Sequence, residues 1–208
     1  LKKEFATIGS DLCAGDGLCS TSCPIKINVG EYIHIVRERD MSGAGRVLGR
    51  WAGKNLGTIG TALTGILGVA HLSKTVMGDK LTSITGKAMH SMSGGLIPLW
   101  TPSLPKPVTK KDIKTAIEYG AVNGLKGLRD KRVVYFPSCL NQRLGSGKKP
   151  LINDMTELLN KAGFEVIFPE KMENLCCGTI WESKGMPDEA QRKAAELELA
   201  LLKASENG

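Results

Sequence analysis

Apolar residues in the first fifty positions predict one helix that follows a loop. Val29, Ile33 and Val36 recur at helical spacing, which favours an amphipathic helix from about residue 29 to residue 39. The small residues Ser42 and Gly43 are expected to end this helix. The loop before it is rich in small residues and contains three cysteines.

The last hundred residues alternate between strand patterns and helix patterns. Apolar runs at residues 133–136 and 164–168 predict two short buried strands. Between them, Leu151, Met155, Leu158 and Leu159 recur at helical spacing and predict a helix that Gly163, as a left-handed cap, would stop. A final helix is expected to begin near Pro187 and to bury Ala190, Ala194, Leu197 and Leu201. The order strand, helix, strand, helix predicts a β-α-β unit with a parallel strand pair.

The middle of the chain carries a long uncharged stretch. Nineteen residues between Lys54 and Lys74 carry no charged side chain, and four of them are glycine. Their strong apolar residues are expected to form one stripe, made of Leu56, Ile59, Leu63, Ile66 and Ala70. A one-sided stripe favours an amphipathic helix packed on a protein surface over a membrane span. Four prolines, at positions 98, 102, 105 and 107, then predict an extended linker.

These patterns predict a mixed α+β fold in three segments. Residues 1–50 form the first segment, a cysteine-bearing loop and its helix. Residues 51–108 form a glycine-rich helical region that ends in the proline linker. Residues 109–208 form the β-α-β segment. The sequence begins without an initiator methionine or an apolar signal stretch and ends directly after an amphipathic run, so we expect the chain to be a piece of a longer protein.

Composition excludes several classes of protein. With 208 residues, of which 41% are hydrophobic, the chain is too apolar to be disordered. Six cysteines are too few for a disulfide-stapled secreted domain of this size. Residues 51–150 carry fifteen Lys and Arg against four Asp and Glu. No aromatic residues interleave with these cations, so a solvated basic face is favoured over a nucleic-acid partner.

The first cysteine set resembles a ferredoxin ligand pattern. In the run C-x2-C-x2-C-x3-C-P, Cys13, Cys19 and Cys23 occupy three of the four cysteine positions, and Pro24 follows. Asp16 stands at the remaining ligand position. In two-cluster ferredoxins the last cysteine serves the other cluster. The pattern therefore predicts that Cys13 and Cys19 bind one iron–sulfur cluster and that Cys23 binds a second. Zinc binding and buried structural cysteines are the alternatives.

The second cysteine set consists of Cys139 and the adjacent pair Cys176 and Cys177. Cys139 follows the first predicted strand, and the pair follows the second. Loops that leave parallel strands lie at one edge of a sheet, so the three thiols are expected to face one crevice. Gly178 would allow close approach there. This set favours a metal, cluster or redox site over buried neutral thiols. No catalytic motif is found elsewhere, and no catalytic residue is predicted.

At these residues the chain resembles a known family. The segment from Cys13 to Pro24, continued to Gly30, is similar to the second iron–sulfur motif of the large FAD-linked D-lactate dehydrogenases, which carry an Asp-Gly-Leu-Cys core followed by Cys-Pro. Tyr-Phe-Pro-Ser-Cys at 135–139 and Leu-Cys-Cys-Gly at 175–178 resemble their cysteine-rich (CCG) domain. That domain is related to heterodisulfide reductase and to glycolate oxidase iron–sulfur subunits.

The resemblance implies a helical ferredoxin-like segment at 1–50 and a partial CCG domain at 109–208. It implies that an FAD domain and a complete cysteine motif precede this sequence, and that a C-x-x-C follows it. Cys13, Cys19, Cys23 and Asp16 would then bind [4Fe–4S] clusters. Cys139, Cys176 and Cys177 would form a metal site.

The function implied is the electron-transfer portion of a flavin-linked D-lactate (D-2-hydroxy acid) dehydrogenase. Electrons would pass from FAD to a quinone or cytochrome-type acceptor, and this portion alone is expected to be inactive. Its partners would be the FAD and iron–sulfur regions of the same polypeptide, with no nucleic acid. Thiols without disulfides favour the cytoplasm, and the amphipathic middle is compatible with peripheral membrane contact.

Two other functions fit the same residues. One is a heterodisulfide-reductase-like electron-transfer subunit, with thiol–disulfide chemistry at the cysteine pair. The other is a non-catalytic interaction module stabilised by zinc, which would bind metal without colour.

Overall fold

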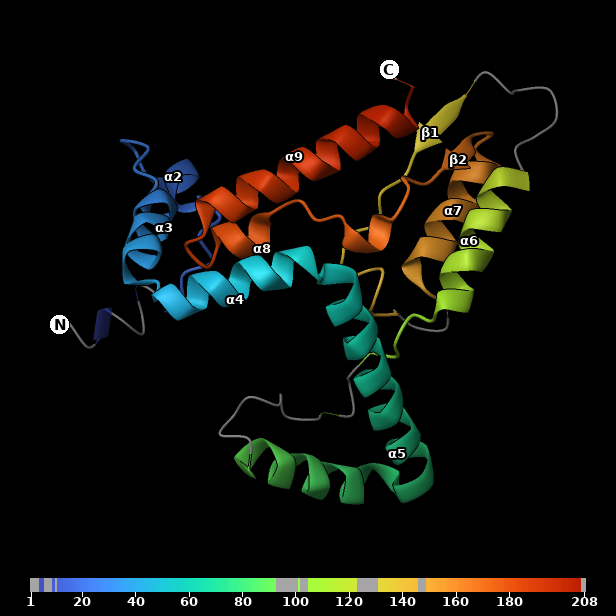
Figure 1. Cartoon of the computed structure of the whole chain (residues 1–208), viewed down its shortest axis with the longest axis horizontal. Helices are drawn as coiled ribbons and strands as arrows, with labels where there is room; N and C mark the ends of the chain where they lie inside the picture. Colours follow the sequence, from blue (N-terminus) through green and yellow to red (C-terminus); the bar gives the residue numbers. More distant parts are fainter. Residues whose placement is uncertain are drawn as a thin grey trace. The chain divides into compact units, whose positions relative to one another are not determined.

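The computed structural model describes residues 4–5, 9, 11–92, 101, 105–122, 131–145 and 149–206 (Figure 1). Its contacts divide the chain into two compact units. Unit 1 combines residues 1–56 with residues 174–200, and unit 2 combines residues 57–173 with residues 201–208. The fold is mixed α+β, as the sequence predicts, with long helices and one small parallel sheet.

Unit 1 begins with short helix α2 (Cys19–Ser22), followed by α3 (Val29–Asp40) and α4 (Gly43–Lys54). The Asn28 side chain caps α3 by accepting a hydrogen bond from the amide of Gly30. Ser42 caps α4 in the same way, accepting from the amide of Gly45 at 3.1 Å. Ser42 and Gly43 therefore begin a new helix as well as separating it from α3. On α3, Ile33 is buried as predicted, whereas Val29 is 46% exposed.

The second part of unit 1 contains α8 (Thr179–Glu182) and most of α9 (Pro187–Ala204). Its core is formed by Cys176, Trp181, Met186 and Ala190, against which Met41 and Leu56 pack. The predicted buried face of α9 is partly wrong. Ala190 is buried, but Ala194 is exposed, and Glu189 and Lys193 are buried instead. The polar residues occupy this face because each has a partner of opposite charge or a carbonyl, as described below.

The middle of the chain forms one long helix, α5 (Leu56–Met92), with non-helical backbone at Gly78. The predicted stripe is packed only in part: Leu56 packs on the core of unit 1, whereas Ile66 is 64% exposed. The buried positions among the described side chains of α5 are Gly57, Gly60, Leu67 and Thr82. Glycine at position 60 matters because an added Cβ would lie 2.4 Å from the guanidinium of Arg143. Close packing of α5 thus uses Gly60, whereas no heavy atom lies within 4 Å of an added Cβ at Gly65 or Gly68. The predicted linker prolines 98 and 102 lie outside the described residues.

Unit 2 contains the sheet. Strands β1 (Arg132–Val134) and β2 (Glu165–Ile167) pair in parallel, with Val133 opposite Val166. This confirms the β-α-β prediction, and α7 (Leu151–Lys161) forms the crossover between the strands. Helix α7 ends where expected, because Gly163 adopts a left-handed φ of 88°.

Helix α6 (Lys110–Val122) packs on α7 and β2. Thr109 and Asp112 cap its start reciprocally: the amide of Asp112 donates to Thr109 Oγ1, and the amide of Thr109 donates to Asp112 Oδ2. Gly120 lets the helix approach the sheet, since a Cβ there would lie 3.0 Å from the carbonyl oxygen of Val166. The Asn160 side chain of α7 donates to the carbonyl of Tyr119 at 2.9 Å.

Candidate functional site

The loop that carries the first cysteine set is folded by two glycines and an aspartate. Gly15 and Gly17 have φ values of 69° and 70°, which favour glycine because a side chain is strained there. Between them, Asp16 Oδ1 accepts a hydrogen bond from the amide of Leu18 at 3.1 Å. The carboxylate thus closes a local turn. Its role as a cluster ligand stays a prediction.

Cys19 and Cys23 lie at the two ends of α2. Cys19 is exposed, Cys13 and Cys23 are half-buried, and the amide of Cys23 donates to the carbonyl of Cys19 at 3.1 Å. Hydrogen bonding from the backbone N–H groups of Ile27 and Ile25 lowers the pKa of the Cys23 thiol. Cys23 therefore ionises more readily than an ordinary cysteine, and the thiolate is the form that binds metals.

Helix α3 packs its buried face against this loop through residues 30, 34 and 37. Gly30 permits the contact, because a Cβ there would lie 3.1 Å from backbone atoms of Gly15 and Gly17. His34 lies over Gly15, and its Nε2 atom is buried with no hydrogen-bond partner. Arg37 donates from Nη2 to the carbonyl of Cys13 at 2.6 Å. The three positions share one side of the helix, a spacing in the sequence that could have identified them.

Arg37 also reaches the second cysteine motif. Its Nη1 donates to the carbonyl of Ser183 at 2.8 Å, just after α8. Nearby, Gly185 has a φ of 75°, and a Cβ there would lie 2.4 Å from the backbone of Arg37 and Glu38. Arg37 and Gly185 therefore join the Cys13 loop to the segment that follows Cys176 and Cys177.

The adjacent cysteines of the second set face different surroundings. Cys176 is 2% exposed, within the core of unit 1, and its Sγ accepts a hydrogen bond from the amide of Gly178 at 3.5 Å. Cys177 is exposed, and its Sγ lies 3.3 Å from Thr179 Oγ1. Gly178 has a left-handed φ of 91°, and this turn directs one thiol inward and leaves the other at the surface.

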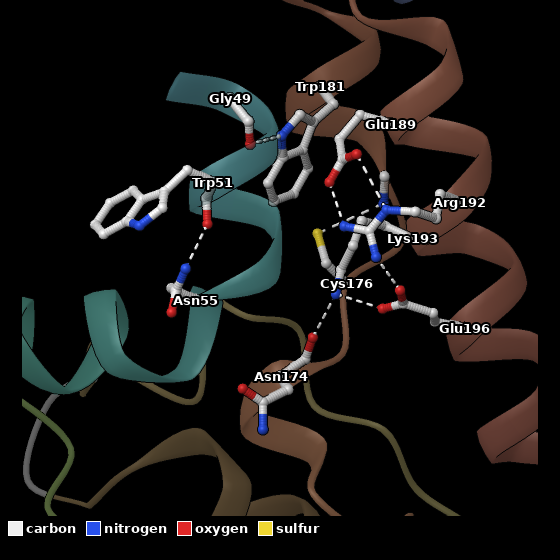
Figure 2. Close-up of polar contacts among 11 residues, drawn as sticks. Gly49, Trp51, Asn55, Asn174, Cys176, Trp181, Glu189, Arg192, Lys193 and Glu196 are labelled. Carbon is white, nitrogen blue, oxygen red and sulfur yellow. Dashed lines mark hydrogen bonds and ion pairs between the residues drawn. The ribbon is translucent and has the colours of Figure 1, made fainter. Parts of the chain in front are cut away.

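A partly buried polar network lies beside Cys176 (Figure 2). Lys193 is 2% exposed, and its Nζ donates to the carbonyl of Asn174 at 2.8 Å and to Glu196 at 2.6 Å. Arg192 pairs with Glu189 and Glu196, and the hydrogen bond to Glu189 raises the pKa of the Arg192 guanidinium. Lys193 thereby fixes the start of the cysteine segment, because Asn174 is only two residues before Cys176. The sequence analysis did not identify this lysine.

Trp181 connects the second motif to α4. Its indole is 6% exposed, and Nε1 donates to the carbonyl of Gly49 at 3.1 Å (Figure 2). A Cβ at Gly49 would lie 2.4 Å from Met186 Sδ, so this glycine allows α4 to approach the core. The neighbouring Trp51 is 55% exposed. One of these two tryptophans therefore belongs to the core and the other to the surface.

Cys139 lies in unit 2, in the turn after β1. The buried side chain of Gln142 donates to the carbonyl of Pro137 at 2.9 Å and closes this turn. Burial lowers the pKa of the nearby Arg143 guanidinium, and the charges of Glu173 and Cys139 oppose that change. Cys139 is thus a half-buried thiol close to a cation.

The structure groups the predicted site residues by unit. Cys13, Asp16, Cys19, Cys23, Cys176 and Cys177 belong to unit 1, and Cys139 belongs to unit 2. The convergence of Cys139 with the cysteine pair on one crevice stays a prediction. Within the part of the chain that the structure describes, no three His, Cys, Asp or Glu side chains are arranged to hold a metal ion. All six cysteines lie in that part, and none forms a disulfide.

The cysteines of unit 1 are expected to differ in their rates of alkylation by iodoacetamide. The labelling rate of Cys23 should reach half its maximum at a pH below the ordinary thiol value of 9.0, because its pKa is lowered. Cys177 should be labelled in the native protein, whereas Cys176 should be labelled only in urea. Peptide mass spectrometry after timed quenching measures each rate. Labelling of native Cys176 as fast as Cys177 would contradict the buried position.

Comparison with known proteins identifies the C-terminal part. Residues 133–207 match the family model CCG, a cysteine-rich domain. This match contains Cys139, Cys176 and Cys177, and the domain occurs in iron–sulfur oxidoreductase subunits. The region is therefore a cysteine-rich module of the iron–sulfur, electron-transfer type. No curated protein and no solved structure matches the chain.

Proposed function

We propose that this chain is the electron-transfer part of a flavin-linked D-lactate, or related D-2-hydroxy acid, dehydrogenase. In this proposal Cys13, Cys19 and Cys23 bind [4Fe–4S] clusters, for which Asp16 is a further candidate ligand. Cys139, Cys176 and Cys177 provide a second metal or redox site. The observation that supports it best is that Arg37 donates hydrogen bonds to the carbonyls of both Cys13 and Ser183. These bonds fix the two cysteine motifs of unit 1 relative to each other.

The donor chemistry of these residues fits an iron–sulfur group. Backbone N–H groups lower the pKa of Cys23 and so favour its thiolate, which is the ligand that iron–sulfur clusters use. The amide of Gly178 donates to Cys176 Sγ, an interaction that also favours negative charge on sulfur. When bound, such a cluster supplies one-electron transfer at a potential that hydrogen bonds to its sulfurs adjust.

Exposed apolar residues around the first cysteine loop suggest how the ligand set is completed. The side chains of Leu12, Leu18, Ile25 and Ile27 are between 53% and 75% exposed. A second cysteine motif could cover them and contribute the remaining thiolates, and its apolar cover would exclude water from the cluster. We assign that motif, together with FAD, to other regions of the same polypeptide. The acceptor is a quinone or a cytochrome-type protein, and the compartment is the cytoplasm.

The test is anaerobic reconstitution of the intact polypeptide with iron and sulfide. We expect a brown protein with two [4Fe–4S] clusters by iron and sulfide count, and paramagnetic signals after dithionite reduction. Cys23→Ser should lose the signal of one cluster and keep the other. Ser22→Ala, a neighbouring exposed position, is the matched control and should keep both. An intact protein without visible absorbance or dithionite-induced signals would refute iron–sulfur binding.

The substrate is tested separately. D-lactate, but not L-lactate, should bleach the flavin of the intact protein and then reduce its clusters in stopped-flow measurements. Clusters that dithionite reduces and D-lactate does not would refute the dehydrogenase assignment and leave an electron-transfer subunit of another enzyme. A colourless protein that holds zinc, and that chelator destabilises, would indicate the interaction module instead.

A further inference from the structure

Helix α5 carries an apolar stretch that the described structure leaves largely uncovered. Leu56–Val76 is long and apolar enough to cross a membrane, with a mean hydropathy of 1.4, yet only 11% of it is buried. A helix in the core of a soluble protein would be mostly buried. Its length of about 30 Å equals the hydrocarbon thickness of a bilayer. The stretch therefore requires an apolar surrounding that the described residues do not provide.

The uncovered residues form one side of the helix. Ile66, Val69, Leu72 and Val76 follow one another at steps of three or four residues and are between 63% and 76% exposed. The other side packs within unit 2, where Leu67 is 7% exposed and Gly60 contacts Arg143. We call the exposed apolar residues of α5 the outer face.

Exposed apolar residues also occur beyond the kink at Gly78, and lysines flank them there. Leu81 and Ile84 are 45% and 64% exposed, and Lys80 and Lys87 are exposed beside them. From Lys54 to Met92 the sequence contains four lysines and one acidic residue, Asp79. Apolar residues flanked by cations complement a surface that is apolar inside and anionic outside, as a membrane of anionic phospholipids is.

We propose that the outer face of α5 binds the surface of an anionic phospholipid bilayer. The helix lies in the interface and does not cross the membrane, because the guanidinium of Arg143 lies against Gly60, inside the apolar stretch. A crossing helix would also draw the packed side at Leu67, near the middle of the stretch, into the lipid together with this charge, and charged groups in hydrocarbon are costly. When α5 lies in the membrane–water interface, the side that packs on the rest of unit 2 remains in water. The outer face enters the lipid.

Co-sedimentation of the 208-residue chain with phospholipid vesicles tests this proposal. The chain should bind vesicles of phosphatidylglycerol and phosphatidylcholine, bind phosphatidylcholine alone more weakly, and bind less at high salt. Ile66→Glu combined with Val69→Glu should weaken binding at least about tenfold, because two aliphatic side chains leave the lipid and two charges replace them. Thr75→Glu is the control, and we expect a change of less than about threefold. Thr75 is exposed, donates to the carbonyl of His71 and lies outside the arc of the helix that Ile66, Val69, Leu72 and Val76 occupy.

Lys80→Gln with Lys87→Gln should weaken binding to the anionic vesicles and leave binding to phosphatidylcholine alone unchanged. Circular dichroism of each variant checks that α5 remains folded.

The proposal is wrong if the wild-type chain does not co-sediment, or if the glutamate pair at 66 and 69 leaves binding unchanged. It is also wrong if light scattering shows a dimer that this pair dissociates, since the outer face would then bind a second copy. The vesicle assay needs neither cluster nor flavin, so its result is independent of the proposed electron transfer.

Discussion

Trp181→Ala is expected to lower the free energy of unfolding by about 4 kcal/mol, the usual cost of deleting a buried tryptophan side chain. The indole lies in the core of unit 1 with Cys176, Met186 and Ala190, and it is 6% exposed. Its removal leaves a cavity and also leaves the carbonyl of Gly49 without the indole N–H. Urea unfolding followed by far-UV circular dichroism measures the change.

Two variants separate the causes of this loss. Trp181→Phe keeps most of the apolar volume but removes the N–H donor, and should cost about 1–2 kcal/mol. Trp51→Ala is the matched control, because Trp51 lies on the same helix as Gly49 but is 55% exposed. Its expected effect is within about 0.5 kcal/mol. Equal losses for Trp181→Ala and Trp51→Ala would show that the core does not lie at Trp181.

Gly178→Ala is expected to lower the free energy of unfolding by about 3 kcal/mol, since it combines a strained backbone with a steric clash. The φ of Gly178 is 91°, and an added Cβ would lie 2.4 Å from the carbonyl oxygen of Ala190. Because that oxygen belongs to the backbone of α9, relief requires the helix or the cysteine turn to move. The amide of residue 178 would then leave Cys176 Sγ, and alkylation of native Cys176 should become measurable.

The control for this substitution is Gly43→Ala. Gly43 begins α4, and no heavy atom lies within 4 Å of an added Cβ. Alanine there should raise the free energy of unfolding by about 0.5 kcal/mol, since it restricts the unfolded chain. Urea unfolding of both variants under the same conditions compares the two positions. A Gly178→Ala protein as stable as Gly43→Ala would mean that the turn at the cysteine pair is not as described.

Much of the local structure follows from nearby residues alone. The parallel strands, α7 with its Gly163 cap and the start of α9 at Pro187 agree with the sequence prediction. Each depends on local signals: an apolar run, helical spacing, or a residue that tolerates a special φ. The cysteine motifs are also local, and the match of residues 133–207 to a cysteine-rich domain contains both the motif at 135–139 and the motif at 175–178.

Prediction failed where a distant partner decides which side of a helix is buried. Lys193 is buried on α9 because Asn174 and Glu196 accept its hydrogen bonds, whereas Ala194 is exposed. The helical spacing of apolar residues predicts that the alanine is buried at such a position, because this pattern registers only hydrophobicity. In α5, Gly60 packs against the side chain of Arg143, a residue far away in the chain, whereas Ile66 is exposed.

The sequence by itself determined the identity and spacing of the six cysteines, the β-α-β order of the C-terminal part, and the uncharged stretch after Lys54. Only the tertiary structure decided that Arg37 joins the Cys13 loop to Ser183, that Cys176 is buried while Cys177 is exposed, and that α5 presents apolar residues outward. The physical reason is that ligand type and helical period are properties of neighbouring residues. Burial and hydrogen bonding depend instead on segments that are far apart in the chain and meet only when it folds.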